Sequence, residues 1–231
     1  MKKIAICITT RNRPDAFNIT YKYWLKYIPE HARIFVVDDA SDKVYFDSDY
    51  RFKHRVGIPK AKNKCLDLAF SWGADYIFLS DDDCFPKVNS WHEPYINSGI
   101  NHLCFTFTSE WGGMPTRKKG RIKGNLVYHI LGCGCMMFFT RKCLEIVGGF
   151  DTTFGLGKYE HTNISRRIFN AGLTDAPFVD IVDSEKLFHS MDKHNEIQRS
   201  FTEKEQRHLL KSNYEYSQSK INSMEYIDFR N

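Results

Sequence analysis

The residues best suited to chemistry in this sequence are three consecutive carboxylates, Asp81, Asp82 and Asp83. They follow the apolar run 76–79 after a single serine. Acids crowded at the end of a buried strand repel each other and lose hydration, which is unfavourable unless a cation or hydrogen bonds compensate. Residues two apart in an extended chain point the same way, so Asp81 and Asp83 can face one ligand and Asp82 another group. Hard oxygen ligands select Mg²⁺ or Mn²⁺, so the pattern predicts a divalent-metal site; the alternative is acids that only cap a turn before Pro86.

The elements that position these acids alternate along the first half of the chain. Apolar runs predict buried strands at 4–9, 33–37 and 76–79, separated by a helix that runs from the turn at 11–15 to about 25–27 and by a helix at 60–72. Strands that alternate with helices imply a parallel sheet covered on both faces, with ligands beyond the carboxyl ends of its strands. Asp38 and Asp39 follow the second strand, so both acidic clusters lie at such an end.

The second half of the sequence predicts a more mixed arrangement. We expect strands at 102–108, 134–140 and 178–182, and helices at 141–147 and 160–171. Near the end, Thr202 and Glu205 have the spacing of a capping box, which predicts a last helix that reaches about residue 214.

The composition indicates an ordinary globular enzyme. The chain has 231 residues, of which 42% are hydrophobic, enough for one sizeable core. Seven cysteines without a CxxC pair indicate neither a disulfide framework nor a zinc site, so a reducing cytoplasm is the expected setting. Residues 4–8 are too short for a signal peptide, and no run approaches the length of a membrane span. Lys and Arg exceed Asp and Glu by 33 to 28, which suits an anionic ligand such as a nucleotide.

Five segments carry a more specific signal, and they follow one another in a fixed order. They are residues 6–13 (ICITTRNR), 36–41 (VVDDAS), 57–63 (GIPKAKN), 81–83 (DDD) and 148–151 (GGFD). Together they resemble the family 2 glycosyltransferases with the GT-A fold, whose corresponding motifs are the first strand and turn, VVDDGS, NxGxxxARN, DxD and GGFDE. The resemblance covers roughly residues 3–190. Lys62 stands where that family usually has arginine.

The resemblance implies a fold and a donor. We expect an α/β GT-A domain at 1–195, with a Rossmann-like mixed sheet flanked by helices, and a C-terminal helical extension at 196–231. The expected partner is a nucleoside-diphosphate sugar, with UDP-sugar as the first choice. The residues implied to bind it are Thr9, Thr10, Arg11, Arg13, Asp38, Asp39, Lys60, Asn63, Asp81 and Asp82.

The same resemblance implies a metal and its ligands. In the family the DxD acids hold a divalent ion that bridges the donor diphosphate, so Mn²⁺ or Mg²⁺ is the expected cofactor and Asp81 and Asp83 are its expected ligands. His189 lies just past the last predicted strand, where GT-A enzymes often supply one more ligand, and a neutral imidazole suits Mn²⁺. The alternative for His189 is a structural histidine.

The sequence departs from the family at the position of the general base. The family usually has Glu-Asp at the start of a helix, whereas this chain has Glu160 and His161. Consecutive helical positions diverge by about 100°, so only one of the two is expected to be the base. We favour Glu160, because a carboxylate at a helix N-terminus stays ionised. Alternatively, Glu160 only caps the helix and His161 lines an acceptor pocket.

Two further segments are candidates for contacting substrate. Trp111, Gly112 and Gly113 lie in a loop that in such enzymes often lines the sugar or acceptor site, although a loop tryptophan can equally pack on its own domain. The basic stretch 117–123 is either a solvated loop or a contact for phosphate.

The resulting prediction is a metal-dependent, inverting glycosyltransferase that acts on a hydroxyl of a glycan. One alternative acceptor is a hydroxylated base of nucleic acid. Another alternative is a non-catalytic module that binds nucleotide sugars. A nucleotidyltransferase is less consistent with the sequence, because residues 9–14 contain no glycine.

Overall fold

The structure is a computed structural model, and it describes residues 2–44, 46–106, 120–197 and 202–230. Within these residues the largest sheet has six strands in the order β3-β2-β1-β4-β9-β6. The first four are parallel to one another, and β9 runs antiparallel between β4 and β6. The strands are β1 (Ile4–Thr10), β2 (Ala32–Asp38), β3 (Tyr50–Arg51), β4 (Tyr76–Asp81), β6 (His102–Cys104) and β9 (Met136–Thr140).

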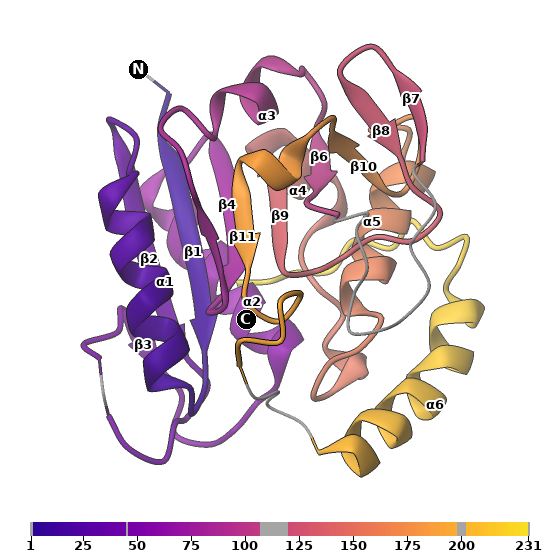
Figure 1. The fold of residues 1–231 in the computed structure, drawn as a ribbon. Coiled ribbons are helices and arrows are strands. Elements are labelled where there is room, and N and C mark those ends of the chain that lie inside the picture. The colour runs from indigo at the N-terminus through magenta and orange to yellow at the C-terminus, as the bar shows by residue number, and fades with distance from the viewer. Residues whose placement is uncertain (1, 45, 107–119, 198–201, 231) are drawn as a thin grey trace.

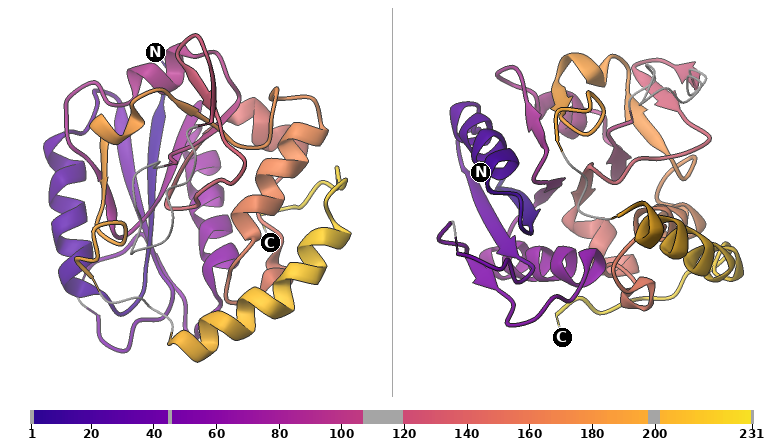
Figure 2. Two further views of the ribbon diagram at one scale, coloured as in Figure 1. Left: turned by 45° about the vertical axis from the view of Figure 1, so that its right-hand side comes forward. Right: turned by 60° about the horizontal axis from the view of Figure 1, so that its bottom comes forward.

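Helices cover both faces of this sheet (Figures 1 and 2). Helices α1 and α2 each begin with a proline in their first turn, where the missing N–H costs nothing. Helix α1 packs on one face, and α2, α4 and α5 pack on the other. The helices are α1 (Pro14–Lys26), α2 (Ile58–Trp72), α3 (Glu93–Asn97), α4 (Arg141–Val147), α5 (Glu160–Asn170) and α6 (Glu203–Ser219), with 3-10 turns at Thr152–Phe154 and Ser184–Lys186.

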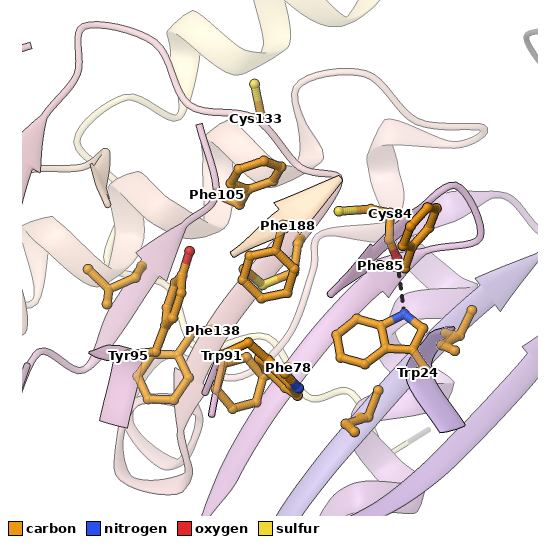
Figure 3. Close-up of a cluster of buried hydrophobic side chains, with 14 of the residues drawn as sticks. Trp24, Phe78, Cys84, Phe85, Trp91, Tyr95, Phe105, Cys133, Phe138 and Phe188 are labelled. Carbon is orange, nitrogen blue, oxygen red and sulfur yellow. Dashed lines mark hydrogen bonds between the residues drawn. The ribbon is translucent and has the colours of Figure 1, made fainter. Parts of the chain in front are cut away.

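The alternation of side chains along the buried strands divides the core into two clusters. In β1, Ile4, Ile6 and Ile8 face α1, whereas Ala5 and Cys7 face α2. The α1 side is rich in aromatic rings (Figure 3). They are Phe17, Trp24, Phe78, Phe85, Trp91, Tyr95, Phe105, Phe138 and Phe188.

Smaller sheets lie beyond the central one. β5 (Cys84–Pro86) pairs with β11 (Phe188–Ser190), and β8 (Leu126–Tyr128) pairs with both β7 (Arg121–Lys123) and β10 (Val179–Ile181). The prediction of a loop at 117–123 was wrong for residues 121–123, which form the exposed strand β7 of a hairpin. Residues 117–119 lie outside the described part of the chain.

The C-terminal region confirms the predicted capping box. The Thr202 hydroxyl accepts from the Glu205 amide, and the Glu205 carboxylate accepts from the Thr202 amide. Beyond α6 the chain returns to the body, where Ile227 bridges to Gly148 and Phe229 packs against Phe70. All seven cysteines are free, as expected. Among the helices of the described residues, none is both long and apolar enough to cross a membrane.

Candidate active site

The carboxyl edge of the parallel strands brings the predicted residues together. The registers place Thr9 beside Asp81 and Thr10 beside Asp38, so the ends of β1, β2 and β4 meet. A pocket opens at this edge. It is lined by Thr9, Thr10, Arg11, Arg13, Asp39, Arg55, Gly57, Ile58, Ala61, Asp81, Asp82 and Leu156. Seven residues predicted to bind the donor therefore line one hollow, which we call the first pocket.

The two acids after β2 hold the walls of this pocket by different contacts. Asp38 accepts hydrogen bonds from the Ser41 amide and hydroxyl and pairs with Arg51, so its carboxylate closes a turn outside the pocket. Asp39 accepts from the amides of Val56 (2.6 Å) and Gly57 (3.0 Å). Burial raises the pKa of Asp39 against the effect of these bonds. Asp39 thus faces the pocket and also fixes the segment that forms its opposite wall.

Two further residues of the predicted donor set, like Asp38, do not line this pocket. Lys60 is exposed, and with Asn63 it lines a separate hollow on the other side of α2. Asn63 is buried, and its amide both donates to the Phe150 carbonyl (2.8 Å) and accepts from the Phe150 amide (2.7 Å). The side chain of Asn63 therefore joins α2 to the glycine-rich segment before Asp151.

The three carboxylates at the end of β4 contact two cations of the chain itself, Arg13 and Lys62. Asp82 is buried, accepts from the Thr10 hydroxyl at 2.6 Å and contacts the Arg13 guanidinium. Arg13 also donates to Asp83 at 2.8 Å. Burial, together with the charges of the neighbouring acids, raises the pKa of Asp83 to about 7 despite Arg13. Three carboxylates in contact with two cations leave excess negative charge, which would favour a bound cation.

Lys62 supplies the cation for the first of these acids. Its ammonium is buried, lies 3.1 Å from the Asp81 carboxylate and donates to the Gly134 carbonyl at 2.9 Å. Burial lowers the pKa of Lys62, but the charges of Asp81 and Glu160 outweigh this effect and raise it. In the sequence, Lys62 stands out only as a departure from a motif, and nothing there predicts this contact.

A second pocket begins where the first one ends. It is lined by Ile58, Asp81, Asp83, Gly132, Cys133, Gly134, Cys135, Lys158, Glu160, His161, Ser190 and Asp192. It shares Asp81 and Ile58 with the first pocket. The acid pair Asp81 and Asp83 and the predicted base therefore face one space, next to the predicted donor site.

Glu160, the residue predicted as the base, is a carboxylate that lines the second pocket. It is the first residue of α5 and is buried, with its Oε1 3.4 Å from His161 Nδ1. Its Oε2 is buried too and has no hydrogen-bond partner among the described residues. Burial opposes ionisation, but His161, Lys62 and the backbone amide together lower the pKa of Glu160 to about 2. A methyl group at Gly134 would lie 2.8 Å from the His161 ring, so the glycine permits this close packing.

The comparison with known proteins bears on the fold. No protein-family model matches the chain. It is 28% identical over 166 residues to a protein of Acanthamoeba polyphaga mimivirus named as an uncharacterized glycosyltransferase, an alignment that covers 62% of this chain and 61% of the relative. The chain thus spans about three fifths of that relative's length.

Solved structures show how the chain folds. The mannosyltransferase PcManGT from Pyrobaculum calidifontis, in complex with GDP-Man and Mn²⁺, has a TM-score of 0.54 at 15% identity and covers 74% of this chain and 53% of its own. TarS from S. aureus has a TM-score of 0.60 at 13% identity, over 90% of this chain and 69% of the TarS fragment. This chain has the GT-A fold.

Within this GT-A fold, His189 lines neither of the two pockets. Its Nε2 lies 2.9 Å from the Glu196 carboxylate, and its ring packs against the rings of His194 and Phe85. In β11 it lies opposite Phe85, whereas the next residue, Ser190, lines the second pocket. Asp192, just beyond β11, lines this pocket together with Asp81, Asp83 and Glu160, and the sequence did not predict it. The only signal for it was its position just beyond the same strand.

The residues of the second pocket fit a divalent ion bound with a substrate. Asp81 and Asp83 offer hard oxygen ligands to one space. Across the described ranges, no group of three or more His, Cys, Asp and Glu side chains is arranged to hold a metal. Mg²⁺ and similar ions are commonly held by one or two carboxylates and completed by substrate phosphates, so two ligands suit this chemistry.

One predicted group cannot be placed. Trp111, Gly112 and Gly113 lie outside the described residues of this GT-A fold. Their assignment to a sugar or acceptor pocket stays a prediction.

Proposed function

We propose that the chain is a metal-dependent glycosyltransferase that moves a sugar from a nucleoside diphosphate to an acceptor hydroxyl. The observation that carries this proposal is the junction of two pockets at Asp81. One pocket offers arginines and an acid for a nucleotide, and the other offers the acid pair and Glu160. A transferase needs such a junction, because the bond that breaks lies between the donor diphosphate and the sugar.

The first pocket would hold the nucleoside diphosphate. Arg11 and Arg55 line it and bring positive charge for phosphates, while Asp39 offers an acceptor for the base or ribose. Arg13 already holds Asp82 and Asp83, so its role is to fix the acids. UDP-sugar is the first donor to test, with GDP-sugar next, since PcManGT binds GDP-Man.

The second pocket would hold the metal and the sugar. Asp81 and Asp83 would bind Mn²⁺ or Mg²⁺, which when bound stabilises the charge that develops on the departing diphosphate. Lys62, held at 3.1 Å from Asp81, keeps that acid aimed at the pocket.

Glu160 would activate the acceptor. As the acceptor oxygen bonds to the anomeric carbon, the bond from that carbon to the diphosphate oxygen breaks and the hydroxyl proton passes to Glu160 Oε2. A carboxylate with a pKa of about 2 is a weak base, so the transfer occurs late, when bond formation has made the hydroxyl strongly acidic. Attack on the face opposite the departing diphosphate would invert the anomeric centre. The acceptor we propose is a saccharide hydroxyl.

A binding screen tests this function. Calorimetry of the wild-type chain with UDP-, GDP- and dTDP-sugars, each with Mn²⁺ and with EDTA, should find one donor that binds only with the metal. Asp83→Asn should lose that binding, and Asp175→Asn, a change at an exposed acid outside both pockets, should keep it. Absence of metal-dependent binding to every donor would refute the proposal.

A further inference from the structure

The segment from Phe154 to Glu160 touches both pockets. Leu156 lines the first pocket, and Lys158 and Glu160 line the second. Helix α5, which carries Glu160, starts here, and the hydrogen bond from the Asn163 amide to the Tyr159 carbonyl closes its first turn. The conformation of residues 154–159, which we call the base loop, therefore decides where the Glu160 carboxylate points.

The base loop has an unfavourable backbone. Gly157, Lys158 and Tyr159 have φ of 125°, 73° and 69°, so two bulky residues in succession adopt left-handed conformations. Such conformations persist only where the surroundings hold them, and they concentrate at functional sites. Glu160 follows them directly. Some contact outside the loop must therefore stabilise it.

Asn213 of α6 makes that contact. Its Nδ2 donates to the carbonyls of Gly157 at 2.7 Å and Phe154 at 3.0 Å, and it lies 3.4 Å from the Lys158 carbonyl. Two tyrosines that follow Asn213 in α6 add weaker support. Tyr216 donates to Asp151 at 2.7 Å and packs on Phe154, and the Tyr214 ring lies 6.0 Å from that of Tyr159.

The rest of α6 contributes little to the core. Of residues 203–219, all of which the structure describes, only Ser217 is fully buried. The helix lies at the edge of the molecule beside α5 (Figures 1 and 2). Its side-chain hydrogen bonds to other elements go to the base loop and to the neighbouring Asp151.

We propose that Asn213 is a positioning residue, which holds the base loop so that Glu160 faces the acceptor and Leu156 completes the donor pocket. This inference rests on the proposed function, because it takes Glu160 as the base. The helix α6 thereby becomes part of the catalytic apparatus, although it contributes no residue to either pocket.

The test compares Asn213→Asp and Asn213→Ala with Ser219→Ala, which removes a bond within α6 to the Tyr216 carbonyl and leaves the contacts of Asn213 in place. Asn213→Asp keeps the shape of the side chain but removes its hydrogen-bond donor, Nδ2. Both Asn213 variants should lower kcat at saturating donor by about tenfold or more, since small displacements of a catalytic group are costly. They should weaken donor binding less. Ser219→Ala should match the wild type in both respects.

Hydrogen exchange gives a readout that does not depend on transfer. The amides of residues 157–163 should exchange faster in both Asn213 variants, while those of β1 and β4 keep their protection. Unchanged loop exchange and unchanged kcat would overturn the positioning role. Faster loop exchange with kcat still at the wild-type value would overturn it too, because the loop would then not control the chemistry. If instead Glu160→Gln kept full activity, the proposed function of Glu160 would fail, and the loop exchange would still show whether Asn213 holds the loop.

Discussion

The ammonium of Lys62 lies 3.1 Å from the carboxylate of Asp81, although the lysine side chain is almost completely buried. The same ammonium holds the Gly134 carbonyl, against which the His161 ring packs. One buried cation thus connects the first acid of the DxD segment with the residues around the predicted base. Removing it should disturb both the acid and the pocket wall.

Lys62→Met should therefore lower both stability and activity. The substitution keeps the length of the side chain but leaves Asp81 and the Gly134 carbonyl without this partner. Because Asp81 is partly exposed, the expected loss in the free energy of unfolding is about 1–2 kcal/mol, less than for a fully buried pair. Urea denaturation and turnover measure the two effects. Lys60→Met, at an exposed position on the same helix, is the control and should change neither; equal behaviour of the two variants would contradict this role.

His189→Ala should leave metal dependence intact. His189 pairs with Glu196 and stacks on Phe85, and it does not line the pocket that Asp81 and Asp83 share. Its removal should change the apparent Mn²⁺ affinity less than twofold, measured by donor binding at varied Mn²⁺. Asp192→Asn, which alters an acid that lines the second pocket, should weaken that affinity more. A loss of metal dependence in His189→Ala alone would restore the histidine as a ligand.

His102 makes stability depend on pH. Burial lowers the pKa of His102 to about 4, against a backbone hydrogen bond to Phe138. Because the ordinary value is about 6.5, the unfolded chain binds a proton between pH 6.5 and 4 that the folded chain does not. The contribution is complete above pH 6.5 and is lost as the pH falls toward 4. It amounts to about 3 kcal/mol.

His102→Asn isolates this effect, since the amide can still donate to Phe138 but does not titrate. Other groups titrate equally in both proteins, so the difference in their free energies of unfolding between pH 7 and pH 4.5 reports His102 alone. The variant should lose less stability over this range than the wild type. Parallel curves would mean that His102 is not buried in its neutral form.

Gly57→Ala should distort the first pocket, which is the proposed donor site. A Cβ at this position would lie 2.2 Å from the Gly155 carbonyl oxygen and 2.8 Å from the Leu156 Cα, and the backbone φ is 91°. The base loop would have to move, so donor affinity should fall about tenfold or more. Gly99→Ala has a similar φ of 70° but no neighbour within 4 Å, and it separates backbone strain from displacement. Both variants should lose stability, and only Gly57→Ala should lose donor affinity.

Local patterns predicted most elements of the fold. The helices at 141–147 and 160–171 and the strands of the parallel half coincide closely with α4, α5, β1, β2 and β4. The predicted strand at 102–108 is shorter, because pairing with β9 ends at Cys104. Strand β9 pairs antiparallel with β4 and β6, unlike the parallel strands β1 to β4. This pairing joins segments far apart in the sequence, so the local periodicity does not predict it.

The candidate site shows the same division. The ends of parallel strands placed Thr9, Asp39 and Asp81 at one edge, as the sequence predicted. The motif at 57–63 does not show which side of helix α2 faces the pocket. Lys60 was therefore expected in the first pocket, which Ala61 lines instead. His189, predicted as a metal ligand, does not line the second pocket, and its direction follows from the pairing of β11 with β5.

Release of nucleoside diphosphate from the donor, measured in a single turnover with Mn²⁺ and an acceptor sugar, tests the central claim most directly. We predict that the wild type releases it, that Asp83→Asn neither binds the donor nor releases the product, and that Glu160→Gln binds the donor normally but releases the product about 10²-fold or more slowly. Donor binding without release in the wild type, or full release by Glu160→Gln, would contradict the account.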